Sequence, residues 1–237
     1  HKKELTGEEM LLRKKFRPVP TALSPKTRPL RPYQKDMVTN LEKCRYEIHS
    51  KGELVAVLYM DAPGGSGKDD MAYYFGQYTG LPGNILFLAP QKDQLDKVDR
   101  DWPEKYVEHF KNPKGFSTMT IASMYELMKR VVEKTPLNKS YTSKLEIVKN
   151  SGTIIFNEVH TLSKGKDVQM IPTIRDGLAQ LGLHFTIVNM TACTDDINDK
   201  AWGVPKDKNH LVEADGVDEW LNPTDVHTIL CGMKVRW

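Results

Sequence analysis

A glycine-rich segment that ends in a lysine carries the clearest chemical signal in the sequence. Residues 62–69 read APGGSGKD and lie between an apolar run and a segment with helical spacing. Closely spaced glycines let backbone N–H groups turn toward phosphate oxygens, a helix start adds the positive end of its dipole, and Lys68 brings a positive charge to the terminal phosphates. We predict a phosphate-binding loop, with a glycine-rich surface turn as the plainer alternative. The candidate ligands are Gly64, Gly65, Ser66, Gly67, Lys68 and Asp69.

Small or polar residues follow two further apolar runs, 153–156 and 185–190. They are Asn157, Glu158 and His160 after the first run, and Thr191, Ala192 and Cys193 after the second. In an open α/β sheet, ligands bind at the carboxyl ends of the strands. Glu158 is therefore placed to orient or deprotonate a water that attacks a γ-phosphate. A plain turn after a strand is the alternative, and the segment at Thr191 is a weak signal by itself.

Alternating apolar and helical patterns predict the elements that position these residues. The runs that read as buried strands are 53–60, 84–89, 116–121, 153–156 and 185–190, with 228–235 as a sixth candidate. Helical spacing occurs over 32–48, 69–78, 92–107, 124–132 and 168–181. Strands that alternate with helices imply βαβ crossovers, so we predict an α/β fold with a doubly wound, mostly parallel sheet and helices on both faces. Residues 134–150 are polar and poorly patterned, and we expect an insertion or an irregular helix there.

The composition excludes several classes of protein. With 237 residues, the chain is long enough for one large domain but not for two full-sized ones. No apolar run approaches the roughly 18–20 residues that a membrane span needs, and the N-terminus lacks the apolar core of a secretory signal. The three cysteines, Cys44, Cys193 and Cys231, are too scattered for a disulfide framework or a zinc site, which favours a reducing, intracellular location.

Positive charge is concentrated at the N-terminus. Residues 1–35 hold ten Lys/Arg and three Glu, a net charge of +7 in a chain whose total is +3, and residues 17–32 contain five prolines. We predict a basic, proline-rich leader over 1–29 and one domain over 30–237. The leader is either a contact for nucleic acid or a solvated arm.

In their order along the chain, these segments resemble the N-terminal RecA-like ATP-binding domain of superfamily 2 helicases, the DEAD/DEAH and restriction-type group. The resemblance covers roughly residues 28–235. The matching segments are LRPYQ at 30–34, APGGSGKD at 62–69 (motif I), FLAPQ at 87–91 (motif Ia), TIASMY at 120–125, NEVH at 157–160 (the D-E-x-H box) and TACT at 191–194 (motif III).

The resemblance implies a P-loop domain that binds ATP or ADP and acts on nucleic acid, DNA or RNA. The implied roles are adenine contact for Gln34 and catalysis for Lys68, Glu158 and His160. Thr191, Ala192 and Cys193 are the implied coupling segment, motif III, which His160 connects to the acidic box. The implied contacts to the nucleic-acid backbone are Pro90, Gln91, Lys92, Ser123 and Met124. Motors of this group close ATP between two RecA-like domains, so a second such domain is expected in the full-length chain, beyond the last residues of this sequence.

Two departures from the family pattern affect one metal ion. Asp69 stands where the family has the Thr whose hydroxyl binds Mg²⁺, and Asn157 stands where it has the Asp that binds the same ion. A carboxylate about 4 Å from a phosphate oxygen costs on the order of 4 kcal/mol at an effective dielectric constant of about 20, so we expect impaired hydrolysis. The alternative is an active site in which Asp69 holds the ion from the opposite side, since the summed charge of the two positions is unchanged. The metal-binding candidates are Asp69, Asn157 and Glu158.

Two other functions stay open at this point. A helicase-derived domain can serve as a non-catalytic scaffold or nucleic-acid-binding module. An unrelated P-loop phosphotransferase would make the later motifs coincidences. Nucleotide binding separates the scaffold from the motor domain.

Overall fold

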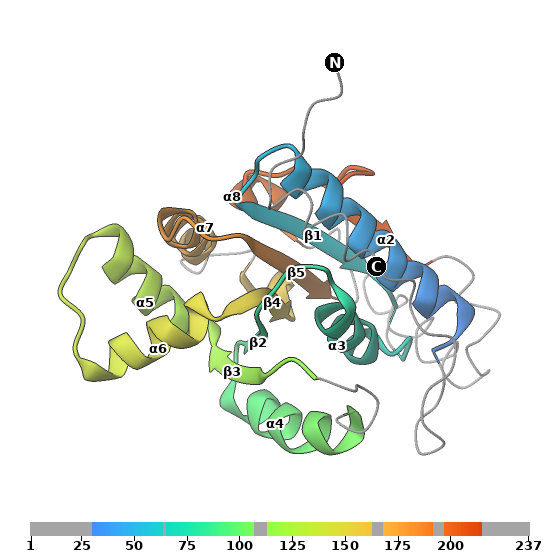
Figure 1. Ribbon diagram of the computed structural model, residues 1–237, viewed down its shortest axis with the longest axis horizontal. Coiled ribbons are helices and arrows are strands. Elements are labelled where there is room, and N and C mark those ends of the chain that lie inside the picture. Colours follow the sequence, from blue (N-terminus) through green and yellow to red (C-terminus); the bar gives the residue numbers. More distant parts are fainter. Residues whose placement is uncertain (1–29, 64, 107–112, 163–167, 192–196, 215–237) are drawn as a thin grey trace, which may run out of the picture.

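The structure is a computed structural model that describes residues 30–63, 65–106, 113–162, 168–191 and 197–214. Its centre is a sheet of six strands in the order β3-β2-β4-β5-β1-β6, and every pairing is parallel (Figure 1). The strands are β1 Val55–Asp61, β2 Asn84–Ala89, β3 Phe116–Thr120, β4 Ser151–Asn157, β5 Phe185–Thr191 and β6 Leu211–Glu213. The predicted parallel α/β sheet is confirmed.

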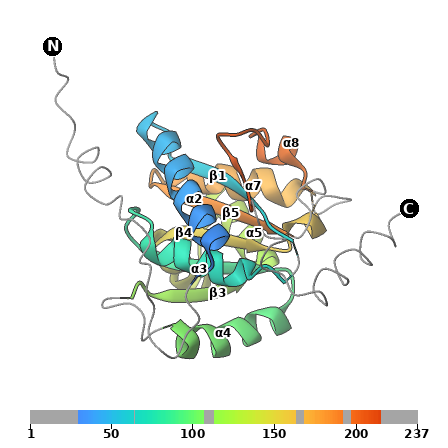
Figure 2. The same ribbon diagram turned by 90° about the vertical axis from the view of Figure 1, so that its right-hand side faces the viewer.

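Helices cover both faces of the sheet, as the sequence predicts (Figures 1 and 2). One layer comprises α2 Pro32–Ser50, α3 Lys68–Tyr78 and α4 Lys92–Tyr106, and the other comprises α5 Ile121–Val132, α6 Lys139–Lys149, α7 Met170–Gln180 and α8 Asp199–Trp202. A single turn of 3₁₀ helix, η2 Val159–Leu162, follows β4. The two layers enclose two separate apolar clusters, one on each side of the strands.

Burial on both faces explains why the strands read as continuous apolar runs. In β1, Ala56, Leu58 and Met60 join the cluster under α2 and α3, while Val57 and Tyr59 join the cluster under α5 and α7. Removing one such large apolar side chain from water stabilises the fold by about 1.5–3 kcal/mol. The central strands therefore hold their carboxyl ends firmly in place.

The register of the sheet brings the strand ends together at one edge. Residues paired at that edge are Asp61 with Thr191, Asn157 with Met190, and Ala89 with Thr120. The carboxyl ends of β1, β2, β3, β4 and β5 therefore meet at one edge. Every motif identified in the sequence follows one of these strands, apart from the segment 30–34, which leads into α2.

Two expectations need correction. Residues 139–149 form a regular helix, α6, whose first turn is capped because Oδ1 of Asn138 accepts from the backbone N–H of Tyr141 at 3.0 Å. The short strand β6 was not predicted, because three residues give too little pattern. The predicted leader 1–29 and the candidate strand 228–235 lie outside the described residues.

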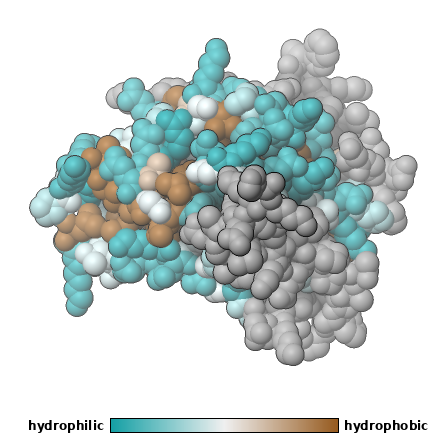
Figure 3. Space-filling view, turned by 45° about the horizontal axis from the view of Figure 1, so that its top comes forward, coloured by the Kyte–Doolittle hydropathy of each residue, from teal (hydrophilic) through white to brown (hydrophobic). Residues whose placement is uncertain are grey.

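The α5–α6 pair projects from one end of the sheet (Figure 1). Val131, Leu137 and Leu145 of this region are only partly buried, and Figure 3 shows apolar residues at the surface on the same side of the molecule. Among the described residues, no helix has the length and apolar content needed to cross a membrane.

Candidate functional site

The glycine-rich loop has the backbone conformation that its glycines predict. Gly65 and Gly67 have φ angles of 77° and 79°, in the left-handed region that glycine adopts without steric cost. Gly67 is the N-cap of α3, which begins at Lys68. The first N–H groups of a helix lack intrahelical acceptors, so they are available to a ligand in the loop. Gly64 lies outside the described residues.

Lys68 places a cation inside this loop. Its Nζ donates to the carbonyl oxygen of Pro63 at 3.2 Å, which leaves further ammonium donors for a ligand. Burial lowers the pKa of Lys68, while the carboxylates of Asp69, Glu158 and Asp61 act in the opposite direction. Lys68 and Glu158 are 90 residues apart in sequence, but the strands that precede them, β1 and β4, both pair with β5, so the loop and the acidic box meet at the same edge of the sheet.

The loop rests on two side chains from the start of α2. The carbonyl oxygen of Ser66 accepts from Oη of Tyr33 at 2.7 Å and from Nε2 of Gln34 at 2.9 Å, and Oε1 of Gln34 accepts from the backbone N–H of Arg31 at 2.9 Å. A Cβ atom at Gly67 would lie 2.6 Å from Nε2 of Gln34. Gln34, predicted as an adenine ligand, therefore packs against the loop and holds its backbone. Its contact with adenine stays a prediction.

The acidic box and the end of β5 form a chain of polar contacts. Nδ1 of His160 lies 3.2 Å from Oε2 of Glu158 and 2.9 Å from Oγ1 of Thr191. The side chains of His160 and Glu158 are 35% and 36% exposed, whereas Thr191 is buried. Glu158 has a left-handed φ of 51°, which costs a non-glycine residue about 1–3 kcal/mol. Ala192 and Cys193 lie outside the described residues.

Asp69 lies in the first turn of α3, beside Lys68. Although its side chain reaches solvent, desolvation by the surrounding protein raises its pKa. The neighbouring Asp70 and Glu158 add to this rise, while Lys68 and Lys97 oppose it.

The donor set suits Mg²⁺ bound chiefly through a nucleotide. Among the described residues, no group of three or more His, Cys, Asp or Glu side chains has the arrangement of a metal site. Mg²⁺ is usually held by one or two carboxylates together with substrate phosphates. The carboxylates of Asp69 and Glu158 and the amide oxygen of Asn157, the last residue of β4, are oxygen donors of that kind.

The two segments predicted to contact nucleic acid are neighbours at the carboxyl edge, because Ala89 pairs with Thr120. The first segment is Pro90, Gln91 and Lys92, of which Gln91 and Lys92 are exposed. In the second, Ser123 is partly exposed, but Met124 is fully buried in the apolar cluster of its layer. The side chain of Met124 therefore has no surface for a ligand, so its predicted contact with nucleic acid has no support in the structure.

Three side chains near these sites had no role in the sequence interpretation. Asp61, which acts on Lys68, ends β1, and the rule that ligands meet strand ends points to it. The hydroxyl of Tyr33 supports Ser66, but nothing in the sequence indicates that contact. Lys144 reaches Ser123 from α6, with Nζ 2.6 Å from Oγ, across a helix pair whose packing the sequence did not predict.

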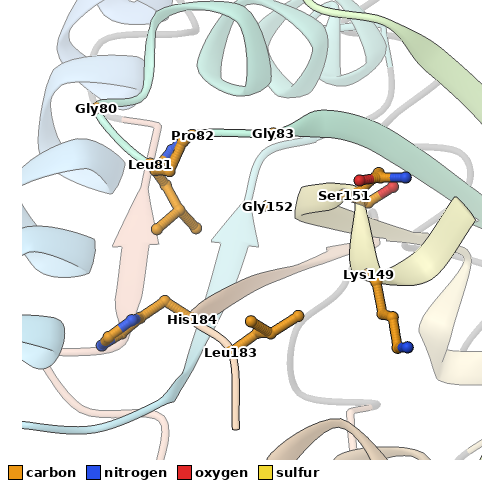
Figure 4. Close-up of a pocket in the computed structure, with 10 residues that line it drawn as sticks. Gly80, Leu81, Pro82, Gly83, Lys149, Ser151, Gly152, Leu183 and His184 are labelled. Carbon is orange, nitrogen blue, oxygen red and sulfur yellow. The ribbon is translucent and has the colours of Figure 1, made fainter. Parts of the chain in front are cut away.

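A hollow of about 370 Å³ lies at the opposite, amino-terminal edge of the sheet. The segments that lead into β2, β4 and β5 line it, and Leu81 and Leu183 point into it (Figure 4). Lys149 and His184 are the ionisable side chains among its described lining residues. The groups suited to phosphate lie instead at the carboxyl edge.

Comparisons with known proteins agree with this geometry. Residues 27–196 match the profile of a family described as type III restriction enzyme, res subunit. No curated protein matches the chain. A crystal structure of the DUF1998 helicase MrfA bound to DNA and AMPPNP has a similar fold, with a TM-score of 0.50 and 12% identity over 84% of this chain. The similarity covers 30% of the MrfA chain, so this sequence spans less than a third of that helicase, and at this identity it establishes the fold alone.

Proposed function

The chain belongs to the family of type III restriction enzyme res subunits, and we propose that it is a nucleotide-binding RecA-like motor domain of a superfamily 2 helicase or translocase. The proposal rests on one observation above the others. The glycine-rich loop follows β1 and the acidic box follows β4, the two strands on either side of β5, and Thr191 at the end of β5 pairs with Asp61 and lies 2.9 Å from Nδ1 of His160. A phosphate chain held by the loop would therefore face the group that serves the attacking water.

The proposed ligand is ATP or ADP. Backbone N–H groups of Gly65, Ser66 and Gly67 and the start of α3 would hold its phosphates, and the ammonium of Lys68 would neutralise them. Gln34 would fix the loop and contact the adenine. AMPPNP in the MrfA structure supports a nucleotide on this fold.

Hydrolysis is proposed to be impaired. Glu158 and His160 remain, but Asp69 and Asn157 occupy the positions where the family has its Mg²⁺ ligands. Asp69, Asn157 and Glu158 would hold the ion, whose chemistry is to neutralise charge on the phosphates. The negative charge of Asp69 would instead repel the phosphates. The repulsion energy is on the order of 4 kcal/mol for a separation of about 4 Å and an effective dielectric constant of about 20.

The proposed partner is the sugar–phosphate backbone of a nucleic acid. Gln91 and Lys92 follow β2 and Ser123 follows β3, two strands that are paired at the carboxyl edge, and DNA in the MrfA structure supports this class of partner. Such contacts are independent of base sequence. A second RecA-like domain in the full-length protein would complete the nucleotide site.

Thermal unfolding with ATP or ADP tests the proposal. A ligand at 100 times its Kd stabilises the folded state by about 2.7 kcal/mol, so millimolar nucleotide is expected to raise the Tm of the wild type and not that of Lys68→Ala. Lys149→Ala, on the opposite edge of the sheet, is the control and should respond like the wild type. The second candidate, a helicase-derived scaffold that binds no nucleotide, is favoured by the carboxylate of Asp69 in the loop. It is supported if the wild type shows no shift.

A further inference from the structure

Two cations converge beside Ser123 on the α5–α6 pair. Nζ of Lys144 donates to Oγ of Ser123 at 2.6 Å and lies 5.5 Å from the ring centroid of Tyr141. The guanidinium carbon of Arg130 lies 4.3 Å from the same centroid. One aromatic ring and one hydroxyl therefore hold a lysine and an arginine close together.

Neither cation has an acidic partner among the described residues. In the part of the chain that the structure describes, no ion pair includes Arg130 or Lys144. Contact with the Tyr141 ring leaves both charges in place, and Nε of Arg130 is buried without a hydrogen-bond partner in the described part of the chain. By contrast, Lys149 on the same helix lies 3.2 Å from Glu146. Two unpaired cations with unused donors suit an anion that offers several oxygens.

The position of the cluster favours a polyanion at the carboxyl edge of the sheet. Ser123 belongs to the first turn of α5, directly after β3, and the pairing of Ala89 with Thr120 places the segments that follow β2 and β3 next to each other at that edge. The α5–α6 pair projects beyond the sheet from this point (Figure 1). A polyanion that lies along the carboxyl edge would pass from Lys92 to Ser123 and then meet Lys144.

We propose that Lys144 and Arg130 bind a backbone phosphate of the nucleic acid and lengthen the contact surface from the sheet edge onto α6. This inference rests on the proposed function, because it takes the same nucleic acid as its ligand. It adds two residues, held by Tyr141 and Ser123, that the family motifs do not include. A purely structural role, in which Lys144 only ties α6 to α5, is the alternative.

Fluorescence anisotropy with a labelled single-stranded oligonucleotide over a range of salt concentrations tests the proposal. Each phosphate neutralised on a single strand contributes about 0.7 to the slope of log K against log salt. Lys144→Ala is expected to weaken binding roughly three- to tenfold at low salt. It should also reduce the magnitude of the salt slope by nearly 0.7, the contribution of one phosphate on a single strand. Lys144→Arg should restore the slope, and Lys149→Ala, the matched control on α6, should leave it unchanged.

The outcomes separate this inference from the function on which it rests. One outcome is that the wild type binds the oligonucleotide and Lys92→Ala weakens this binding, but Lys144→Ala has the same salt slope as the wild type. The inference is then wrong and the proposed function stands. A lower Tm for Lys144→Ala with an unchanged slope would establish the structural role instead. If the wild type shows no binding at low salt, both proposals fail.

Discussion

Nδ1 of His160 lies 2.9 Å from Oγ1 of Thr191, and this contact joins the acidic box after β4 to the end of β5. The same nitrogen lies 3.2 Å from Oε2 of Glu158. An ionised carboxylate can only accept a hydrogen bond, so a favourable contact with Glu158 requires the proton on Nδ1. The Thr191 oxygen then shares that N–H as a second acceptor.

We therefore predict that the neutral ring of His160 carries its proton on Nδ1 and leaves Nε2 free. Nitrogen-15 NMR of labelled histidine reads the tautomer directly. Thr191→Val should lower the free energy of unfolding by about 0.5–1.5 kcal/mol, as for one lost hydrogen bond. A ring protonated on Nε2, or a Thr191→Val variant as stable as the wild type, contradicts the arrangement.

The raised pKa of Asp69 predicts a pH-dependent stability. Because its pKa is higher in the folded state, folding holds the proton more tightly, and stability falls as pH rises from about 3.9, the ordinary pKa of Asp, through the raised value. Asp69→Asn removes this loss. The free energy of unfolding of the variant should therefore show no gain over the wild type at low pH and the full gain at neutral pH. Denaturant unfolding across this range measures it, with Asp93→Asn in the first turn of α4 as the control. An advantage that does not change with pH would show that the carboxyl does not titrate as expected.

The contacts of Gln34 predict a cost for a nearly isosteric change. Gln34→Glu replaces the donor to the Ser66 carbonyl with a second acceptor, in a site where Gln34 is only 8% exposed. A buried group left without its partner costs about 1–3 kcal/mol, and the loop should bind nucleotide more weakly. Chemical denaturation measures the first effect and nucleotide titration the second. Gln91→Glu, on the exposed surface, should change stability little, and equal stabilities of the two variants would contradict the role of Gln34.

Asn189 predicts a stabilising substitution. It is fully buried in β5 between Tyr59 and Phe156, and neither polar atom of its amide has a hydrogen-bond partner among the residues that the structure describes. Asn189→Leu removes the penalty of the unpaired amide, which is about 1–3 kcal/mol, and keeps the branching and the number of side-chain heavy atoms. Thermal unfolding should show a higher Tm. A lower Tm would contradict the prediction.

Much of the fold follows from local pattern. The strands β1 and β2 are apolar over nearly their whole length because both faces of the sheet are covered there, and this feature is visible without any knowledge of their partners. The strand β6 has three residues, of which only Val212 is buried, so its pattern carries no comparable signal. Over α6 the sequence indicated only an insertion or an irregular helix, because Val148 is the one fully buried residue of this helix.

The candidate site, like the fold, can be predicted from the sequence only in part. Gly65, Gly67 and Lys68 are neighbours in the sequence, so their spacing alone indicates a phosphate loop, and the family match confirms the resemblance to superfamily 2. The contact between Lys144 and Ser123 depends on how α5 packs on α6, which no local pattern encodes. The burial of Met124 follows from the face that α5 turns to the sheet. Such contacts between distant segments are what the structure adds.

The dependence of ATP binding and hydrolysis on Mg²⁺ tests the central claim most directly. Calorimetric titration with and without Mg²⁺, together with a hydrolysis assay, would compare the wild type, Lys68→Ala and the double variant Asp69→Thr/Asn157→Asp. We predict that the wild type binds ATP through Lys68, that Mg²⁺ changes this affinity little, and that turnover does not exceed that of Lys68→Ala. The double variant should gain binding that Mg²⁺ strengthens. Mg²⁺-dependent turnover by the wild type that disappears in Lys68→Ala would contradict the account and identify an active site in which Asp69 holds the metal.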